Sequence, residues 1–139
     1  MPRHLAYRVL AALTASFLLL FGFVFLCGFI DRTLFQVLAH PLFETDAWGY
    51  YVLGVAGTAL IAWAVALFAT ARAPTVHRGV ATATTVGLIL GAVLRLLAWY
   101  SGEYRDAGDQ LRLESAIFLV LALGFVWLRP PRPETPPHA

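Results

Sequence analysis

Two oppositely charged residues interrupt apolar stretches of this sequence, and a guanidinium and a carboxylate can pair with each other or bind a ligand. Arg95 lies within GAVLRLLAWYSGEY, residues 91–104, and Glu114 lies near the start of LRLESAIFLVLAL. An arginine near the middle of a membrane helix costs roughly 2.5–3.5 kcal/mol on insertion scales. A carboxylate partner or outward snorkelling of the side chain would lower that cost. We therefore expect Arg95 to have a partner.

Glu114 is the best candidate partner, and Asp46 is the next. The short connection 101–110 would bring the outer ends of two antiparallel helices together, with Arg95 on one and Glu114 on the other. Three interpretations remain open. The pair locks the register of the two helices, or Arg95 centres a polar site for an anionic or quinone-like ligand, or Arg95 simply snorkels. In the second case the walls of the site would be Trp48, Tyr51 and Trp99.

Recognisable motifs of catalysis and metal binding are missing from the sequence. None of its four histidines lies inside a predicted membrane span, and neither HExxH nor CxxC occurs. There is also no G-x-S-x-G elbow and no P-loop. We therefore predict no cofactor, no metal and no enzymatic activity.

The composition is that of a membrane protein. Of 139 residues, 60 % are hydrophobic and 13 % charged, and the mean hydropathy is +0.73. Soluble proteins are about 45–50 % apolar and roughly 25 % charged. The net charge of +2 is small and scattered, so nucleic-acid binding is not expected. The lone cysteine, Cys27, excludes an intrachain disulfide.

Four segments are long and apolar enough to span a bilayer, which takes about 20 residues in a helix. They are residues 7–30, 47–71, 79–100 and 111–128. The first is too long for a cleaved signal and is expected to be retained. The predicted fold is therefore an all-α bundle of four transmembrane helices, forming one domain over residues 1–128.

The connections differ in character. Residues 31–46, DRTLFQVLAHPLFETD, mix apolar and polar side chains and predict a short interfacial helix broken at Pro41. Residues 129–139 contain five prolines and predict a disordered cytoplasmic tail.

Small residues at steps of four mark the expected packing faces of the helices. In membranes such residues allow close approach of helix backbones. The third span has a GxxxG pair that favours internal packing, with a homodimer contact as the alternative. Arg95 lies four residues after Gly91 and therefore continues the same face of the helix. The residues in these faces are Ala11, Ala15 and Gly22 in the first span, Gly54, Thr58, Ala62 and Ala66 in the second, and Gly87 and Gly91 in the third.

Arginine distribution predicts the orientation in the membrane. Six arginines lie on the side shared by the two termini and the 72–78 turn, and three lie on the other side. The positive-inside rule then places both termini in the cytoplasm. Trp48, Tyr51 and Trp99 belong to the aromatic belt expected at the outer interface.

The stretches DAWGYYVLGVAGTALIAWAVALF, GLILGAVLRLLAWYSGEY and LRLESAIFLVLAL together resemble the DoxX-like and uncharacterised small four-helix bacterial inner-membrane proteins. The resemblance covers residues 7–128. It implies the four-helix architecture, and for some relatives an association with membrane redox systems, but no catalytic motif. The matching residues are Gly49, Gly54, Gly87, Gly91, Arg95 and Glu114.

The function predicted first is that of a non-catalytic accessory or interaction component in the lipid bilayer, with itself or another membrane protein as partner. The alternative is binding or transport of a small amphiphile, quinone or anion at an outer-leaflet site centred on Arg95. A third possibility is a subunit of a membrane redox system whose partner supplies the cofactor.

Overall fold

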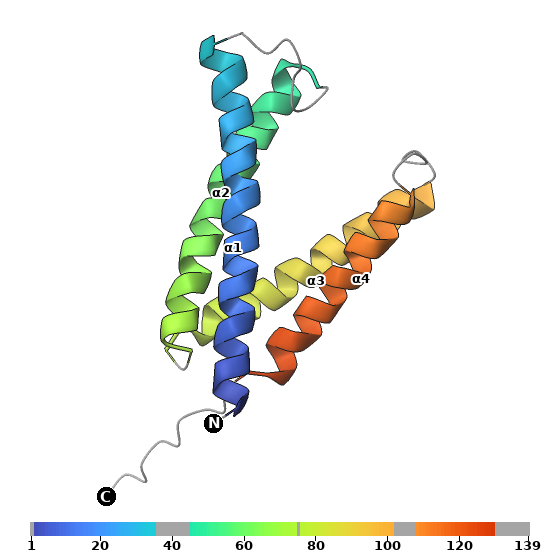
Figure 1. The fold of residues 1–139 in the computed structure, drawn as a ribbon. Helices are drawn as coiled ribbons and strands as arrows, with labels where there is room; N and C mark the ends of the chain where they lie inside the picture. The colour runs from blue at the N-terminus through green and yellow to red at the C-terminus, as the bar shows by residue number, and fades with distance from the viewer. Residues whose placement is uncertain (1, 36–44, 75, 102–107, 130–139) are drawn as a thin grey trace, which may run out of the picture. The chain divides into compact units, whose positions relative to one another are not determined.

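The computed structural model describes residues 2–35, 45–74, 76–101 and 108–129, and the regular structure in these ranges is helical (Figure 1). Within these residues, four helices are long and apolar enough to cross a membrane. The prediction of an all-α protein with four such helices is confirmed. The helices are α1 (Pro2–Ile30), α2 (Ala47–Arg72), α3 (Arg78–Ser101) and α4 (Gly108–Trp127).

The helices begin where local chemistry favours a helix start, which is not always where the apolar stretch begins. α1 runs from Pro2, five residues before the predicted span, and proline is compatible with the first position of a helix. α2 begins after Asp46, whose Oδ1 accepts a 2.8 Å hydrogen bond from the amide of Gly49. A side-chain oxygen three residues ahead of an unpaired amide is an N-cap. Asp46 thus starts α2.

The segment that follows α1 differs in part from its predicted form. Asp31–Phe35 is a π-helical turn, η1, that continues directly from Ile30. The Thr33 hydroxyl donates to the carbonyl of Phe29 at 2.7 Å, which ties η1 to the last turn of α1. The rest of the predicted interfacial helix, residues 36–44, lies outside the described residues, as does the predicted tail from residue 130 onwards.

Contacts divide the chain into two compact units, one of Met1–Ala11 with Ala69–Ala139 and one of Ala12–Phe68. The prediction of a single four-span domain is not tested by this division. We name them the terminal unit and the central unit.

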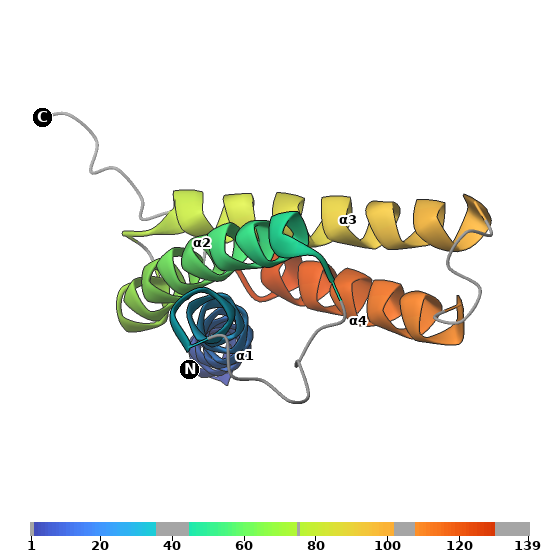
Figure 2. The same cartoon turned by 90° about the horizontal axis from the view of Figure 1, so that it is seen from above.

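In the central unit, α1 and α2 lie side by side (Figures 1 and 2) and approach through glycine. A Cβ on Gly57 would lie 2.7 Å from the carbonyl oxygen of Gly22, and one on Gly22 would lie 2.8 Å from that of Gly57. Real Cβ atoms do not come so close to backbone oxygens. Gly54 also makes a close approach, but to a side chain: a Cβ there would lie 2.8 Å from the ring of Phe29. The two backbones therefore meet where neither has a side chain.

The contact with α1 uses Gly54 from the predicted face of α2 together with Gly57, which was not part of that face. Gly54 and Gly57 are buried, whereas Thr58 and Ala62 are exposed. The hydroxyl of Thr58 donates to Val55 in its own helix, at 2.8 Å. The reason is geometric: with 3.6 residues per turn, each step of four residues drifts about 40° around the helix, so alternating steps of three and four follow the contact better.

In the terminal unit, α3 and α4 run side by side along their length (Figures 1 and 2). The buried residues of α3 recur every three or four positions, as one face of a helix requires. Gly91 lies against the ring of Phe118 on α4, and a Cβ there would be 2.8 Å from it. Gly87, its predicted companion, is half-buried. The buried set is Ala81, Thr84, Leu88 and Ala92.

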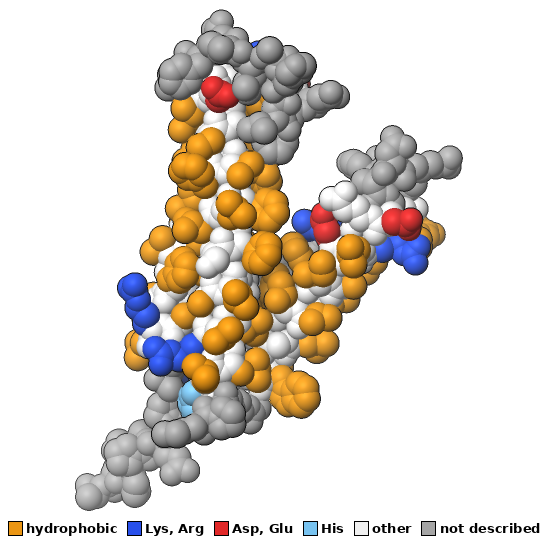
Figure 3. Space-filling model, viewed as in Figure 1, with side chains coloured by type: hydrophobic (Ala, Val, Ile, Leu, Met, Phe, Trp, Pro, Cys, Tyr) orange, Lys and Arg blue, Asp and Glu red, His pale blue; other side chains and the backbone are white. Residues whose placement is uncertain are grey.

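The surface of the helices is mostly apolar. On the face seen in Figure 3, hydrophobic side chains cover the length of the helices, and charged side chains gather toward the helix ends. Large residues such as Leu94, Val120 and Leu123 are about two-thirds exposed. In water this would be unfavourable, whereas lipid chains cover such side chains without cost.

Candidate functional site

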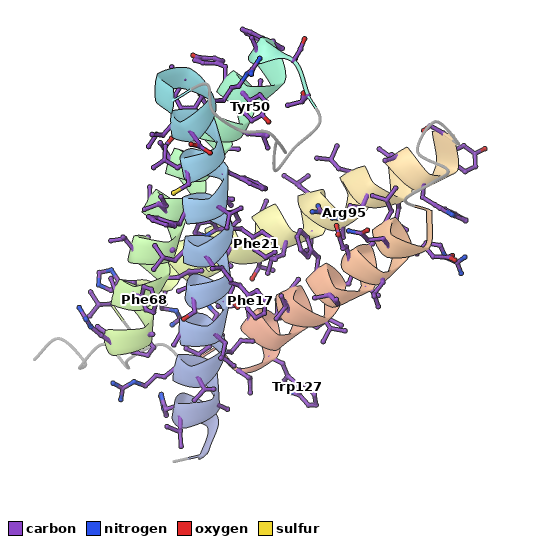
Figure 4. All side chains as sticks on the ribbon, turned by 45° about the horizontal axis from the view of Figure 1, so that its top comes forward. Phe17, Phe21, Tyr50, Phe68, Arg95 and Trp127 are labelled. Carbon is purple, nitrogen blue, oxygen red and sulfur yellow. The ribbon has the colours of Figure 1, made fainter. Side chains whose placement is uncertain are left out.

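The Arg95 side chain on α3 reaches across to α4 (Figure 4) and pairs with Glu114. The Nε of Arg95 donates to Oε2 of Glu114 at 2.7 Å. The Nη1 of Arg95 donates to the carbonyl of Gly91, one turn earlier in α3, at 3.3 Å. The Cζ of the guanidinium lies 4.2 Å from the centre of the Phe118 ring. Arg95 therefore has an ion pair, a backbone acceptor and an aromatic face.

Glu114 is occupied on both carboxylate oxygens. Oε1 accepts a 2.8 Å hydrogen bond from Nε2 of Gln110, one turn earlier in α4. Oε2 accepts from Arg95. The side chains of Arg95 and Glu114 are 31 % and 34 % exposed, so the pair lies at the edge of the helix contact rather than in its centre. The pair has no net charge, and it joins α3 to α4 at the edge of their contact.

A buried serine strengthens the same interface. The Ser115 hydroxyl, 1 % exposed, donates to the carbonyl of Ala92 on α3 at 3.1 Å. Away from water a hydroxyl needs an acceptor, and this bond supplies one across the interface. Ser115 follows Glu114 in sequence, so two adjacent residues of α4 each bond to α3.

Trp99 lies on α3 one turn beyond Arg95, but it contacts a different cation. The Cζ of Arg112 lies 5.3 Å from the centre of the Trp99 ring. Arg112 also lies 3.6 Å from a carboxylate oxygen of Asp109. These side chains are well exposed, so this second group contributes little to stability.

The other predicted site residues belong to the central unit. Asp46 caps α2. Trp48 and Tyr51 stack on each other with ring centres 5.4 Å apart, and they are 70 % and 51 % exposed. Their predicted place around Arg95 remains a prediction, because they lie in a different unit from α3 and α4.

Three residues at or next to the Arg95–Glu114 pair were not predicted from the sequence: Gln110, Ser115 and Phe118. Gln110 and Phe118 lie four residues before and after Glu114, and such positions share one face of a helix. Helical spacing counted from Glu114 would have found both. Ser115 has no comparable signal, since a serine in an apolar helix often bonds its own backbone.

Within the described ranges, no group of three or more histidine, cysteine, aspartate or glutamate side chains could hold a metal ion. The contacts of Arg95 make the site an ion pair with an aromatic cover, which suits charge pairing or the binding of an anion to the guanidinium.

Comparison with protein-family models, with curated proteins and with solved structures gives no match for this chain. The class defined by its described residues is that of an all-α protein with four apolar helices of membrane-spanning length. The resemblance to DoxX-like proteins stays a prediction.

Proposed function

We propose that the protein is a non-catalytic integral membrane protein that acts as an accessory or interaction component, associating with a partner membrane protein or with a second copy. The observation that supports this most is that the charged groups of Arg95 and Glu114 are bonded to groups of the protein itself. Glu114 has both oxygens engaged, and Arg95 is covered by Phe118. An acid or base that works on a substrate needs an atom free to reach it. Here the charged groups hold two helices together.

The proposed setting is the bacterial inner membrane, with both termini in the cytoplasm and kinship to the DoxX-like proteins. The distribution of arginines supports this orientation. The exposed helix faces, which are apolar, are available to lipid and to the helices of another membrane protein. Association would then depend on the shape of the folded helices rather than on the charge of Arg95.

The test compares single and double substitutions of the pair. Arg95→Leu leaves the Glu114 carboxylate without its cation, and Glu114→Leu leaves the guanidinium without its anion, so each should lower the amount of folded protein. The double variant replaces both with apolar groups, which is often neutral or stabilising. We expect chemical cross-linking in native membranes to yield a specific complex for the wild type, less for each single variant and nearly the wild-type amount for the double variant.

Arg112→Gln with Asp109→Asn is the matched control, because it removes an exposed ion pair from the same hairpin. It should leave cross-linking unchanged. A folded double variant of Arg95 and Glu114 that fails to cross-link would show that the charge itself is needed, against the proposal. Absence of any specific cross-linked complex for the wild type would also contradict it.

A second candidate function is the binding of a small anion or amphiphile at Arg95. It is favoured by one observation: Nη2 of Arg95 has no hydrogen bond to any described residue, and the side chain is 31 % exposed. Mass spectrometry of the purified protein would detect a co-extracted quinone or lipid. Loss of that molecule in Arg95→Leu, but not in the Arg112→Gln, Asp109→Asn control, would favour this function.

A further inference from the structure

A second polar cluster lies in the terminal unit, where α3 begins and α4 has just ended. It consists of Tyr7 on α1, Arg78 at the first position of α3 and Arg129, two residues after α4. We name it the arginine–tyrosine cluster. Tyr7 is completely buried, and its ring packs edge-on against Phe125 with centres 5.9 Å apart. The position of its hydroxyl is therefore held by packing.

Three polar atoms of this cluster are buried and have no hydrogen-bond partner among the described residues. They are the hydroxyl of Tyr7, Nη1 of Arg78 and Nε of Arg129. The segments that carry these residues meet here, because Tyr7 packs on Phe125, one turn before Arg129, and Arg129 bonds to the carbonyl of Arg78. Buried polar atoms nearly always have partners, since each one left without costs stability. Three such atoms in one cluster indicate that a group outside the described residues accepts their hydrogen bonds.

The Nη2 nitrogen of Arg129 fixes this side chain on the first turn of α3. It donates to the hydroxyl of Thr82 at 2.8 Å and to the carbonyl of Arg78 at 3.3 Å. These acceptors are neutral, and neither Arg78 nor Arg129 forms an ion pair with a carboxylate in the part of the chain that the structure describes. Arg129 is thus held beside the backbone of Arg78, and the described residues provide neither arginine with a carboxylate partner.

The unsatisfied atoms define the chemistry of the missing partner. All three are able to donate a hydrogen bond, and the guanidinium nitrogens can only donate, so the partner must offer several acceptors. Two guanidinium groups require it to be negatively charged. A phosphate group meets both conditions, and guanidinium groups bind phosphate strongly.

The start of α3 adds to this preference. The first amides of a helix have no intrahelical acceptor, and the helix dipole is positive at that end. Gly79, the residue after Arg78, lies in open space, since an added Cβ would meet no atom within 4 Å. If α3 spans the bilayer, its first turn lies at the membrane surface, which is the depth of the phospholipid headgroups. Basic pockets between helices at this depth suit anionic headgroups.

We propose that Tyr7, Arg78 and Arg129 form a binding site for a phosphate group, and that the phosphate is that of an anionic phospholipid in the leaflet next to the start of α3. The site is separate from the Arg95–Glu114 pair. It gives the protein a lipid preference that its apolar surface alone would not provide.

The experiment measures the thermal stability of the delipidated full-length protein in neutral detergent, titrated with phosphatidylglycerol, with phosphatidylcholine or with inorganic phosphate. We expect phosphatidylglycerol to raise the Tm of the wild type, with saturation, and phosphatidylcholine and inorganic phosphate to raise it far less. Arg78→Gln and Arg129→Gln should each weaken the apparent affinity for phosphatidylglycerol about tenfold, as expected for loss of a charged hydrogen bond.

Tyr7→Phe is the sharpest variant because it removes only the buried hydroxyl. Without lipid its Tm should equal or exceed that of the wild type, since an unsatisfied group is gone. With phosphatidylglycerol it should gain less stability than the wild type. This variant also keeps the test valid if Arg129→Gln, which loses its contacts to α3, does not fold. Arg72→Gln, an exposed arginine on the last turn of α2, is the control and should bind within about twofold of the wild type.

Two outcomes would overturn the proposal. Wild-type affinity for phosphatidylglycerol in both Tyr7→Phe and Arg78→Gln would show that the cluster does not bind the headgroup. Saturable stabilisation by inorganic phosphate that depends on the same residues, with no effect of phosphatidylglycerol, would replace the lipid by a soluble phosphate.

Discussion

At the scale of single residues, the question is how polar groups are accommodated within apolar helices. Arg95 is accommodated by three contacts of different kinds, with Glu114, Gly91 and Phe118. Ser115 is accommodated by one contact, with a backbone carbonyl on the neighbouring helix. Arg95 and Ser115 therefore each connect α3 with α4.

Ser115→Ala should destabilise the protein by about 1 kcal/mol, since it removes a buried hydrogen bond between helices. The measurement is the free energy of unfolding in detergent micelles. Ser16→Ala is the control, because Ser16 is exposed and bonds within its own helix to Ala12. It should change the free energy by less than about 0.5 kcal/mol. Equal effects of the two substitutions would show that the Ser115 bond does not join the helices.

At the scale of elements, the two helix pairs are held by different means. α1 and α2 approach backbone to backbone, at Gly22 and Gly57. α3 and α4 approach through a glycine against an aromatic ring, at Gly91 and Phe118, and are joined by the Arg95–Glu114 pair. A backbone cannot move aside for a new methyl group without shifting the whole helix, whereas a ring can rotate. The α1–α2 contact should therefore tolerate less change.

Gly57→Ala should destabilise the protein by about 1–3 kcal/mol, because the new methyl group would lie 2.7 Å from the carbonyl oxygen of Gly22. Gly91→Ala should cost less, since the Phe118 ring can shift. Gly79→Ala, in open space, should be neutral or slightly stabilising, because alanine favours the helix. Unfolding of the three variants in micelles gives the order. A Gly57→Ala protein as stable as the wild type would mean that the α1–α2 contact is not this close.

At the scale of the whole molecule, the lengths of the helices match a bilayer. α3 has 24 residues, which at 1.5 Å per residue is about 36 Å, enough to cross a hydrocarbon core of about 30 Å. The residues just before and at the end of α3 should then lie on opposite sides of the membrane.

Cysteine labelling tests this topology. In a Cys27→Ala background, Val76→Cys and Ser101→Cys introduce exposed thiols before and at the end of α3. A membrane-impermeant maleimide added to intact cells should label position 101, and should reach position 76 only after the cells are opened. The reverse pattern would invert the predicted orientation, and labelling of both positions from outside would show that α3 does not span.

The candidate site can be predicted in part from the amino-acid sequence. Arg95 and Glu114 stand out as charges in apolar runs, and the short connection between their helices favours a contact, which the structure has at 2.7 Å. The same reasoning makes Asp46 a second possible partner, but Asp46 is the cap of α2. A capping role and a pairing role are both compatible with an aspartate at a helix start, so the residue type alone does not separate them.

The number of long helices and their approximate limits follow from the amino-acid sequence alone, because the bilayer requires about 20 apolar residues for each span and such runs are local. Which residues meet between α1 and α2 is visible only in the folded structure, where Gly57 lies against Gly22 and Thr58 and Ala62 are exposed. The folded structure also placed Arg129 on the first turn of α3, 51 residues away along the chain. Such contacts depend on how each helix is rotated about its axis. In lipid that rotation is decided by side-chain packing and scarce hydrogen bonds, since apolar residues can face the membrane equally well in every direction.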